Sequence, residues 1–375
     1  MPLKPQRPLV APGDVPFLVA LLHVDGIGVA RAEVLLARYR TAERAWCAPA
    51  AALRALLGDE VAGALVVLRR RSDVGALWDA VAACGARVVL RGDPAYPPLL
   101  AHTARAPLLL YVLGDARLLA RPSVAIVGTR RATEYGRRAA DGIARDLVQA
   151  GFAVVSGLAL GIDSAAHAAA LDAGGATVAV LGCGLDQVYP PGSDRLRAAI
   201  MARGALVTEY PLGAEPLPGR FPARNRIVSG LALATVVVEA GERSGALITA
   251  GLAADQGRDV FAVPGPIDRP QSRGPNRLIA DGAGVALSGA DIAAALQADL
   301  AVDRFDARES LPADPVEAAL CAHLGRQPRH VDAVGNASGL AAPDVLRGLA
   351  LLELKGLARH VGGMQWVIAD DQRSS

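Results

Sequence analysis

From residue 86 onward the sequence alternates short apolar, β-rich runs with longer segments of helical spacing. This pattern leaves few folds open, because parallel strands need a crossover between them, and the crossover is usually a helix that packs on the sheet. We therefore predict an α/β fold, a Rossmann-like doubly wound and mostly parallel sheet with helices on both faces. The candidate strands are Val88–Leu90, Leu108–Val112, Val124–Val127, Ala153–Val155, Thr177–Leu181, Leu206–Thr208, Thr235–Glu239 and Val260–Ala262.

Smaller regions flank the predicted sheet on both sides. Apolar residues between Val15 and Ala83 recur at helical spacing. Towards the other end, helical patterns precede a short β-rich run at Gln365–Ile368, an order typical of a winged helix. The expected segments are a helical domain of SAM or helix-hairpin-helix type at 1–85, the α/β domain at 86–300, a charged linker at 301–313 and a winged-helix domain at 314–375.

Basic residues directly follow one of the predicted strands. The run Val124–Val127 leads into a glycine turn with two arginines, and a helical pattern begins near Gly136. Because ligands of parallel sheets bind beyond the carboxyl ends of the strands, this turn is expected to present its basic side chains at the ligand edge. The glycine alone would also fit any tight turn between a strand and a helix. The residues of the turn are Gly128, Thr129, Arg130 and Arg131.

A second basic group lies in the stretch from Phe221 to Leu231, where a helix is expected to start. The free N–H groups and partial positive charge of a helix start attract anions, so Arg224 and Arg226 beside Asn225 favour a phosphate site. An aromatic ring beside guanidinium groups suits a base next to its own backbone, as in grooves for single-stranded nucleic acid. A buried phenylalanine at the start of an ordinary surface helix is the alternative.

Five motifs in chain order carry a family resemblance: Ala125–Gly136 (AIVGTRRATEYG), Ser156–His167 (SGLALGIDSAAH), Leu181–Pro190 (LGCGLDQVYP), Phe221–Leu231 (FPARNRIVSGL) and Ser244–Gly251 (SGALITAG). Together they resemble the DNA-processing protein A family (DprA/Smf). The resemblance implies a single-stranded DNA binder, not a nuclease or polymerase, that loads a RecA-type recombinase during uptake and recombination of foreign DNA. It also implies a homodimer through the central domain. The nucleic-acid-binding residues are then expected to be Gly128, Thr129, Arg130, Arg131, Ser156, Gly157, Phe221, Arg224, Asn225 and Arg226.

The third motif departs from the family pattern. Family members often have a lysine after its Tyr-Pro pair, whereas here Pro191 follows Tyr189 and Pro190. Either the phosphate contact is absent, or Arg195 or Arg197 supplies it.

Charge is distributed locally, since 39 basic and 37 acidic residues leave a net charge of only +2. Residues 1–75 hold ten basic and seven acidic residues, a formal +3 that permits an auxiliary role in DNA binding. Their turn Gly26-Ile27-Gly28 is either a phosphate-holding helix-hairpin-helix turn or an ordinary helix connector. Residues 314–371 hold five basic and seven acidic residues, a formal −2 that favours a protein contact or an accessory role for this domain.

The alternative class is an enzyme. The dinucleotide fingerprint lacks its third glycine after Gly182-Cys183-Gly184, and there is no Gly-Lys-Ser/Thr phosphate loop. Asp163 and His167 share a helix face without a third metal ligand, and Asp163 also suits a helix start. A nucleoside-monophosphate N-glycosidase would use Glu239, but the residues after Glu239 lack the Pro-Gly-Gly-x-Gly-Thr stretch of that class. We therefore predict a binding protein without catalytic residues, cofactor or metal.

The cysteines Cys47, Cys84, Cys183 and Cys321 stand far apart, without disulfide or zinc spacing, and are expected to be reduced thiols. The amino-terminal stretch has no apolar signal core, and no apolar run reaches membrane-spanning length. We therefore expect a cytoplasmic protein that does not associate with a membrane.

Overall fold

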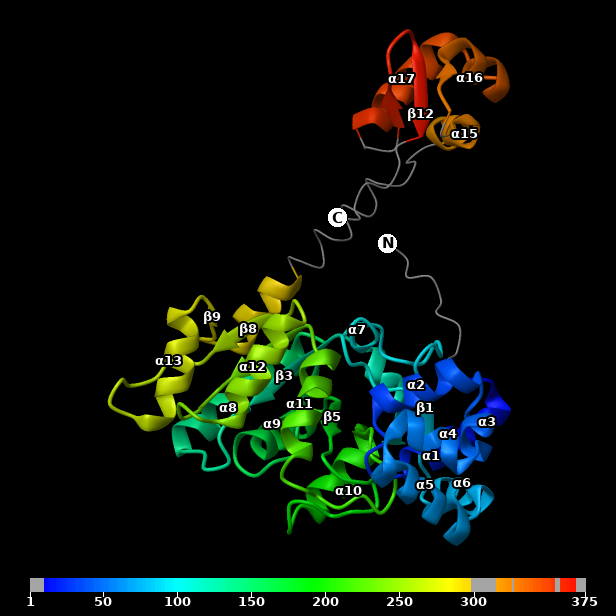
Figure 1. Ribbon diagram of the computed structural model, residues 1–375. Helices are drawn as coiled ribbons and strands as arrows, with labels where there is room; N and C mark the ends of the chain where they lie inside the picture. Colours follow the sequence, from blue (N-terminus) through cyan, green and yellow to red (C-terminus); the bar gives the residue numbers. More distant parts are fainter. Residues whose placement is uncertain (1–9, 298–314, 326, 355–357, 369–375) are drawn as a thin grey trace. The chain divides into compact units, whose positions relative to one another are not determined.

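The computed structural model describes residues 10–297, 315–325, 327–354 and 358–368 (Figure 1). Of these residues, those from 10 to 294 form one compact unit, and those from 295 onward belong to a second. The first unit contains the amino-terminal helices and the large sheet. Among the described helices none combines the length and apolar character needed to cross a membrane.

A nine-stranded sheet forms the centre of the first unit, in the order β1-β2-β6-β5-β4-β3-β7-β8-β9. The strands from β3 to β9 run parallel to one another, while β2 pairs antiparallel with both β1 and β6. The strands are β1 (Arg87–Leu90), β2 (Leu109–Gly114), β3 (Ser123–Val127), β4 (Ala153–Ser156), β5 (Thr177–Val180), β6 (Ala205–Thr208), β7 (Ala234–Val237), β8 (Asp259–Ala262) and β9 (Gly284–Val285).

Every strand predicted from the sequence is present, and the mostly parallel α/β fold is confirmed. Every residue of β3 to β7 is buried, as expected for parallel strands that helices cover on both faces. The prediction missed only β9 in this sheet, whose two residues, Gly284 and Val285, are too short for a periodic pattern.

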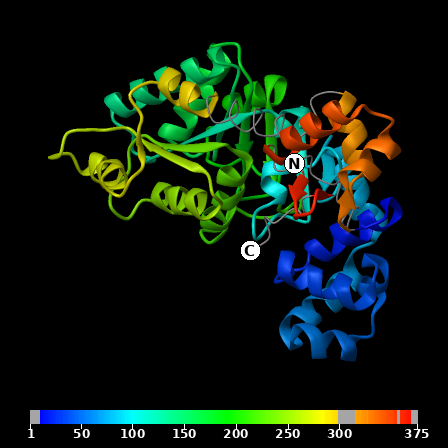
Figure 2. The same cartoon turned by 90° about the horizontal axis from the view of Figure 1, so that it is seen from above.

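Helices cover both faces of the sheet (Figure 2). Helices α8, α9 and α10 pack side by side on one face, and α11 packs against α12 on the other. The helices of this part are α7 (Pro98–Ala101), η2 (Ala116–Ala120), α8 (Glu134–Gln149), α9 (Ile162–Asp172), α10 (Asp194–Arg203), α11 (Arg220–Leu231), α12 (Gly245–Asp255), η3 (Pro270–Ser272) and α13 (Arg273–Ala280).

The chain order creates a switch point beside β3. From β3 the chain adds β4, β5 and β6 on one side, and it later returns to add β7 and β8 on the other. In doubly wound sheets the loops diverge at this point and leave a crevice beyond the carboxyl ends of the strands. The loops after β3 and β7 are therefore the expected walls of a ligand site.

The amino-terminal part is helical, as predicted, and packs on the end of the sheet that carries β1 and β2. Leu18, Leu35 and Leu65 from the helices share one hydrophobic core with Leu109 and Tyr111 of β2. Because the core is continuous, the domain boundary at residue 85 stays a prediction. The helices are η1 (Pro12–Asp14), α1 (Val15–Leu22), α2 (Val29–Tyr39), α3 (Ala42–Cys47), α4 (Ala50–Leu57), α5 (Asp59–Arg71) and α6 (Val74–Ala83).

The second unit has its own core, in which Leu320, Val334, Leu349 and Trp366 are buried. Its antiparallel sheet has the order β10-β12-β11, and β12 confirms the predicted strand at Gln365–Ile368. The predicted linker at 301–313 lies outside the described residues. The elements are α15 (Pro315–His323), β10 (Arg329–His330), α16 (Val331–Ser338), α17 (Ala342–Leu354), β11 (Ala358–His360) and β12 (Gln365–Ile368).

Candidate nucleic-acid interface

A cavity of about 460 Å³ lies at the carboxyl end of the sheet, at the switch point. Its walls are the loops after β3 and β4, the first turns of α11 and α12, and the segment that leads into α11. A smaller recess of about 40 Å³, also lined by Arg130 and Phe221, adjoins it. The cavity brings together predicted residues from three distant motifs: Gly128, Thr129, Arg130, Gly157, Phe221, Arg224 and Asn225.

Close backbone contacts hold the loop after β3 in place. The N–H of Thr129 donates to the carbonyl of Glu239 at 2.7 Å, and the carbonyl of Thr129 accepts from Ile162 at 3.2 Å. A Cβ atom on Gly128 would lie 2.5 Å from Cγ1 of Ile162, so this position requires a glycine. Gly161 has a φ of 85° and faces the carbonyls of Thr129 and Arg130. These contacts fix the backbone from which Arg130 projects.

Arg130 is the exposed arginine of the cavity. Its guanidinium carbon lies 5.6 Å from the ring centroid of Phe221, within the range of a cation–π contact. The ring of Phe221 also contacts that of Tyr189, with centroids 5.0 Å apart. Within the described residues, Arg130 has no hydrogen-bonded or ion-paired side-chain partner. The next residue, Arg131, is also exposed but does not line the cavity.

Arg224 is buried, which corrects the prediction that it projects from a helix start. Its side chain lines the base of the cavity but is only 4% exposed. One guanidinium nitrogen donates to the carbonyls of Gly157, at 2.8 Å, and Val180. Burial lowers the pKa of Arg224, and the nearby Asp163 counteracts this shift. Arg224 therefore ties α11 to the ends of β4 and β5.

Gly157 and Asp163 complete this buried arrangement. A Cβ atom on Gly157 would collide with the guanidinium of Arg224, so the glycine makes room for the arginine. The carboxylate of Asp163 accepts from the N–H groups of Gly157 and Ala159, at 3.2 and 3.3 Å. Burial raises the pKa of Asp163, while Arg224 and these hydrogen bonds oppose the rise.

Arg226 does not line the cavity, and its guanidinium already pairs with a carboxylate. Both of its terminal nitrogens donate to the carboxylate of Glu209, at 2.6 Å each, and the two side chains are only 15% and 14% exposed. The helix α11 begins at Arg220, so Arg224 and Arg226 lie beyond its first turn and its free N–H groups. The free N–H groups of the helix start are therefore not adjacent to these two arginines, and a role of Arg224 and Arg226 in DNA binding stays a prediction.

Two further predicted residues make internal hydrogen bonds. Ser156 is fully buried and donates to the carbonyl of Ile126 at 2.6 Å, so its hydroxyl joins β4 to β3 and does not face the cavity. Asn225 lines the cavity and contacts the carbonyl of Gly245 at 3.4 Å, which links α11 to α12.

Glu239, which the enzyme hypothesis requires, is buried under the start of α8. Its carboxylate accepts from the N–H of Thr133 at 2.9 Å and from the Thr133 hydroxyl, and it does not line the cavity. A Cβ atom on Gly136 would collide with the Glu239 carboxylate. A carboxylate is favourable at a helix N-terminus, so this contact explains Glu239 without catalysis.

His167 also makes a buried internal contact. Nδ1 lies 2.6 Å from the Thr177 hydroxyl, and that hydroxyl donates to the carbonyl of Val154, so Nδ1 must be the donor. Burial, with a smaller contribution from Arg224, lowers the pKa of His167 to about 3. The neutral ring joins α9 to β5. Asp163 and His167 thus have structural contacts that account for both.

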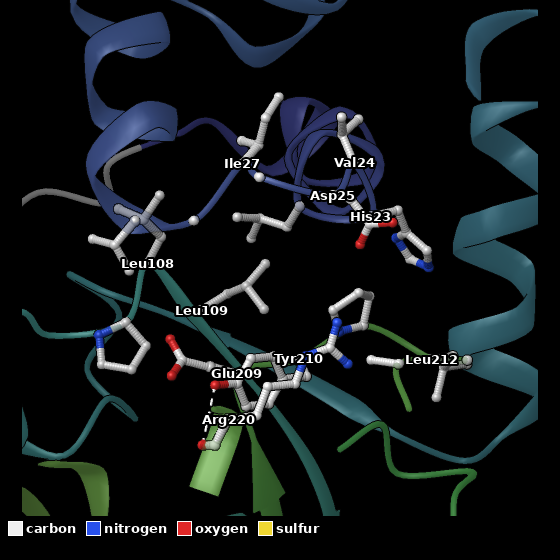
Figure 3. Close-up of a pocket in the computed structure, with 18 of the residues that line it drawn as sticks. His23, Val24, Asp25, Ile27, Leu108, Leu109, Glu209, Tyr210, Leu212 and Arg220 are labelled. Carbon is white, nitrogen blue, oxygen red and sulfur yellow. Dashed lines mark hydrogen bonds between the residues drawn. The ribbon is translucent and has the colours of Figure 1, made fainter. Parts of the chain in front are cut away.

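A second cavity, of about 610 Å³, lies between the turn that joins α1 to α2, the start of β2 and the loop after β6 (Figure 3). The Arg220 guanidinium stacks on the Tyr210 ring, 5.0 Å from its centroid. Asp25, Glu209 and Glu215 also line this cavity, so it is poorly suited to phosphate. The phosphate-holding role of the Gly26-Ile27-Gly28 turn stays a prediction.

One short segment separates the two cavities. Glu215 and Leu217 line the second cavity, while Pro216 and Pro218 line the first. The alternation shows that this segment is a wall that both cavities share. It leads directly into α11 and thus positions Phe221.

Tyr189 belongs to the third motif but is not among the residues predicted to bind DNA. Its ring contacts the ring of Phe221. The presence of an aromatic residue within the third motif is the sequence feature that could have identified it. Of the proposed replacements for the missing lysine, Arg197 is buried and donates to the carbonyl of Leu185 at 2.8 Å. Arg195 is exposed, so it is the available candidate of the two.

Two family models match the chain. The model described as DNA recombination-mediator protein A matches residues 87–297, and the DprA winged helix domain matches residues 306–364. Protein Smf of Synechocystis is 34% identical over 95% of this chain and 99% of that relative. Protein Smf of Escherichia coli is 40% identical over 72% of this chain and 74% of that relative.

Two solved structures resemble the fold. The X-ray structure of DNA processing protein A from Streptococcus pneumoniae superposes with a TM-score of 0.66 and 34% identity, over 74% of this chain and 97% of that chain. The protein of the same name from Helicobacter pylori, whose structure concerns its single-stranded DNA binding mode, gives a TM-score of 0.52 and 31% identity, over 57% of this chain and 96% of that chain.

Proposed function

Because the chain belongs to the DNA recombination-mediator protein A family, we propose that it binds single-stranded DNA in the cavity at the switch point. The observation that carries this proposal is the exposed Arg130, which lies over the ring of Phe221 beside Tyr189. A second exposed arginine, Arg131, follows it in the chain. Guanidinium groups contact phosphates, and aromatic rings stack with unpaired bases. The single-stranded DNA binding mode of the Helicobacter pylori relative supports the same assignment.

The test is a titration of the full chain with single-stranded DNA, duplex DNA and AMP at several salt concentrations. We expect single strands to bind far more tightly than duplex, since stacking on Phe221 requires an unpaired base. Equal affinities for both forms at physiological salt contradict the proposal. Steady release of free base from AMP, abolished in Glu239→Gln, would instead support the glycosidase alternative.

The mediator role is the second part of the proposal. We propose that the bound protein, which carries out no chemical step itself, loads a RecA-type recombinase onto incoming DNA during transformation, and that it acts in the cytoplasm as a homodimer through residues 86–300. The family membership and the single-strand site support the mediator role. A strand-exchange assay tests it, with single strands that a single-strand-binding protein already coats. The protein should restore recombinase activity, and no restoration contradicts loading. Sedimentation of the full chain tests the dimer.

A further inference from the structure

The ring of Phe221 is already in contact on several sides. Arg130 lies over it, and the Tyr189 ring packs against it with an interplanar angle of 33°. A Cβ atom on Gly182 would lie 2.8 Å from Cδ1 of Phe221, so the backbone also approaches the ring closely. A base that stacks on Phe221 must therefore displace one of these neighbours.

Arg130 is the neighbour that is easiest to displace. Gly182 contacts the ring through the backbone at the end of β5, and Tyr189 is half-buried. Arg130 is exposed, and in the described part of the chain its guanidinium has only the stack on Phe221. A cation–π contact at an exposed site shifts an equilibrium by roughly two- to fivefold. A charge-assisted bond to a phosphate is the stronger partner for a guanidinium.

We propose that Arg130 determines specificity by making base stacking on Phe221 conditional on a phosphate. The inference rests on the proposed single-stranded DNA site. Arg130 covers the ring, and a backbone phosphate draws the guanidinium away and so uncovers the ring for the neighbouring base. When a nucleoside without phosphate binds, Arg130 still covers the ring of Phe221. When a polyanion without bases binds, Arg130 moves away but no base stacks on the ring. Single-stranded DNA supplies both groups.

The proposal predicts opposite effects of one substitution on two ligands. In Arg130→Ala the phosphate contact is lost, so a single-stranded oligonucleotide binds more weakly. The ring is uncovered in the same variant, so deoxyadenosine binds roughly two- to fivefold more tightly than it does to the wild type. Arg131→Ala is the matched control, because Arg131 is an exposed neighbour that does not line the cavity. It should give no gain for deoxyadenosine.

Both affinities are measured by NMR titration of the full chain, with melting temperatures to confirm that each variant folds. A second readout is the ring-current shift of the Arg130 side-chain protons, which a 5′-phosphorylated dinucleotide should remove and deoxyadenosine should not. Weaker or unchanged deoxyadenosine binding in Arg130→Ala overturns the inference, since the base would then stack on Arg130 itself or elsewhere. If the wild type fails to bind the oligonucleotide, the proposed function fails as well, so the two failures are distinguishable.

Discussion

At the scale of single residues, the arginines of the site differ in what their guanidinium groups already bind. Among the residues that the structure describes, Arg130 contacts only an aromatic ring, whereas Arg224 donates to two backbone carbonyls and Arg226 to a carboxylate. A guanidinium without such partners is available to a ligand. Removing one that satisfies buried acceptors instead lowers the stability of the fold. Loss of binding and loss of stability should therefore separate between these residues.

Arg130→Ala should weaken binding of single-stranded DNA regardless of base sequence and lower the salt slope by about 0.7 to 1, as the loss of one phosphate contact requires. The melting temperature should stay at the wild-type value, because the side chain is exposed. Titrations at several salt concentrations measure both. Arg117→Ala is the control, since Arg117 is 88% exposed in η2, which precedes β3. An unchanged salt slope in Arg130→Ala places the phosphate contact elsewhere.

Phe221→Ala should differ from Arg130→Ala in its salt dependence. Affinity for single-stranded DNA should fall by about 1 to 3 kcal/mol, the contribution of one stacked base, while the salt slope stays nearly constant because stacking releases no counterions. The same titrations decide this. A drop in salt slope equal to that of Arg130→Ala would show that Phe221 acts only by positioning Arg130.

Arg224→Ala should destabilise the protein. The substitution leaves the carbonyls of Gly157 and Val180 without a donor and the buried Asp163 without its cation, at a cost of about 3 kcal/mol. Thermal or urea unfolding measures this loss. A wild-type melting temperature together with lost DNA binding would restore Arg224 to the role predicted from the sequence.

His167 should make stability depend on pH. The unfolded chain protonates this residue near pH 6.5, whereas the folded pKa is about 3, so protons favour unfolding between these values. The contribution of neutral His167 to the free energy of unfolding is fully present above pH 7, and it should fall by about 2 kcal/mol at pH 5. His167→Asn keeps a donor near Nδ1 but cannot titrate, so its urea unfolding should lose that much less between pH 7 and pH 5. Parallel pH profiles contradict the assignment.

At the scale of elements, the start of α8 depends on a residue far away in the sequence. Thr133 caps the helix, and the Glu239 carboxylate after β7 accepts from both the backbone and the hydroxyl of Thr133. The contact joins α8 to the loop after β7. The backbone N–H of Thr129 also donates to the backbone carbonyl of Glu239, and this hydrogen bond holds the loop that carries Arg130. Through its carboxylate and its backbone carbonyl, Glu239 thus links the start of α8 and the loop after β3 to the loop after β7.

Glu239→Gln should lower the free energy of unfolding by about 1 to 3 kcal/mol, because the amide cannot accept from both Thr133 donors. Affinity for single-stranded DNA should change less than twofold, since Glu239 does not line the cavity. Urea unfolding and the binding titration together check this. Unchanged stability would contradict the capping role.

At the scale of the whole molecule, the two compact units have separate hydrophobic cores. Removing residues 314–375, which are acidic on balance, should leave most of the affinity for single-stranded DNA intact. The measurement is a titration of the truncated chain against the full chain. If truncation abolishes binding while Arg130→Ala binds as the wild type does, the DNA site lies in the second unit.

The sequence alone determined the fold class, and it indicated the motifs that line the candidate cavity. Apolar runs such as Val124–Val127 have the length and burial of parallel strands, and the Gly128 turn follows one directly, so local pattern was sufficient. The sequence did not determine which arginine side chains are available to a ligand. Arg130, Arg224 and Arg226 look alike in sequence, but their partners come from other segments, and one partner of Arg224, the carbonyl of Gly157, is 67 residues away. Whether a guanidinium meets solvent, a carbonyl or a carboxylate depends on how α11 packs on the sheet, and only the tertiary structure decided that.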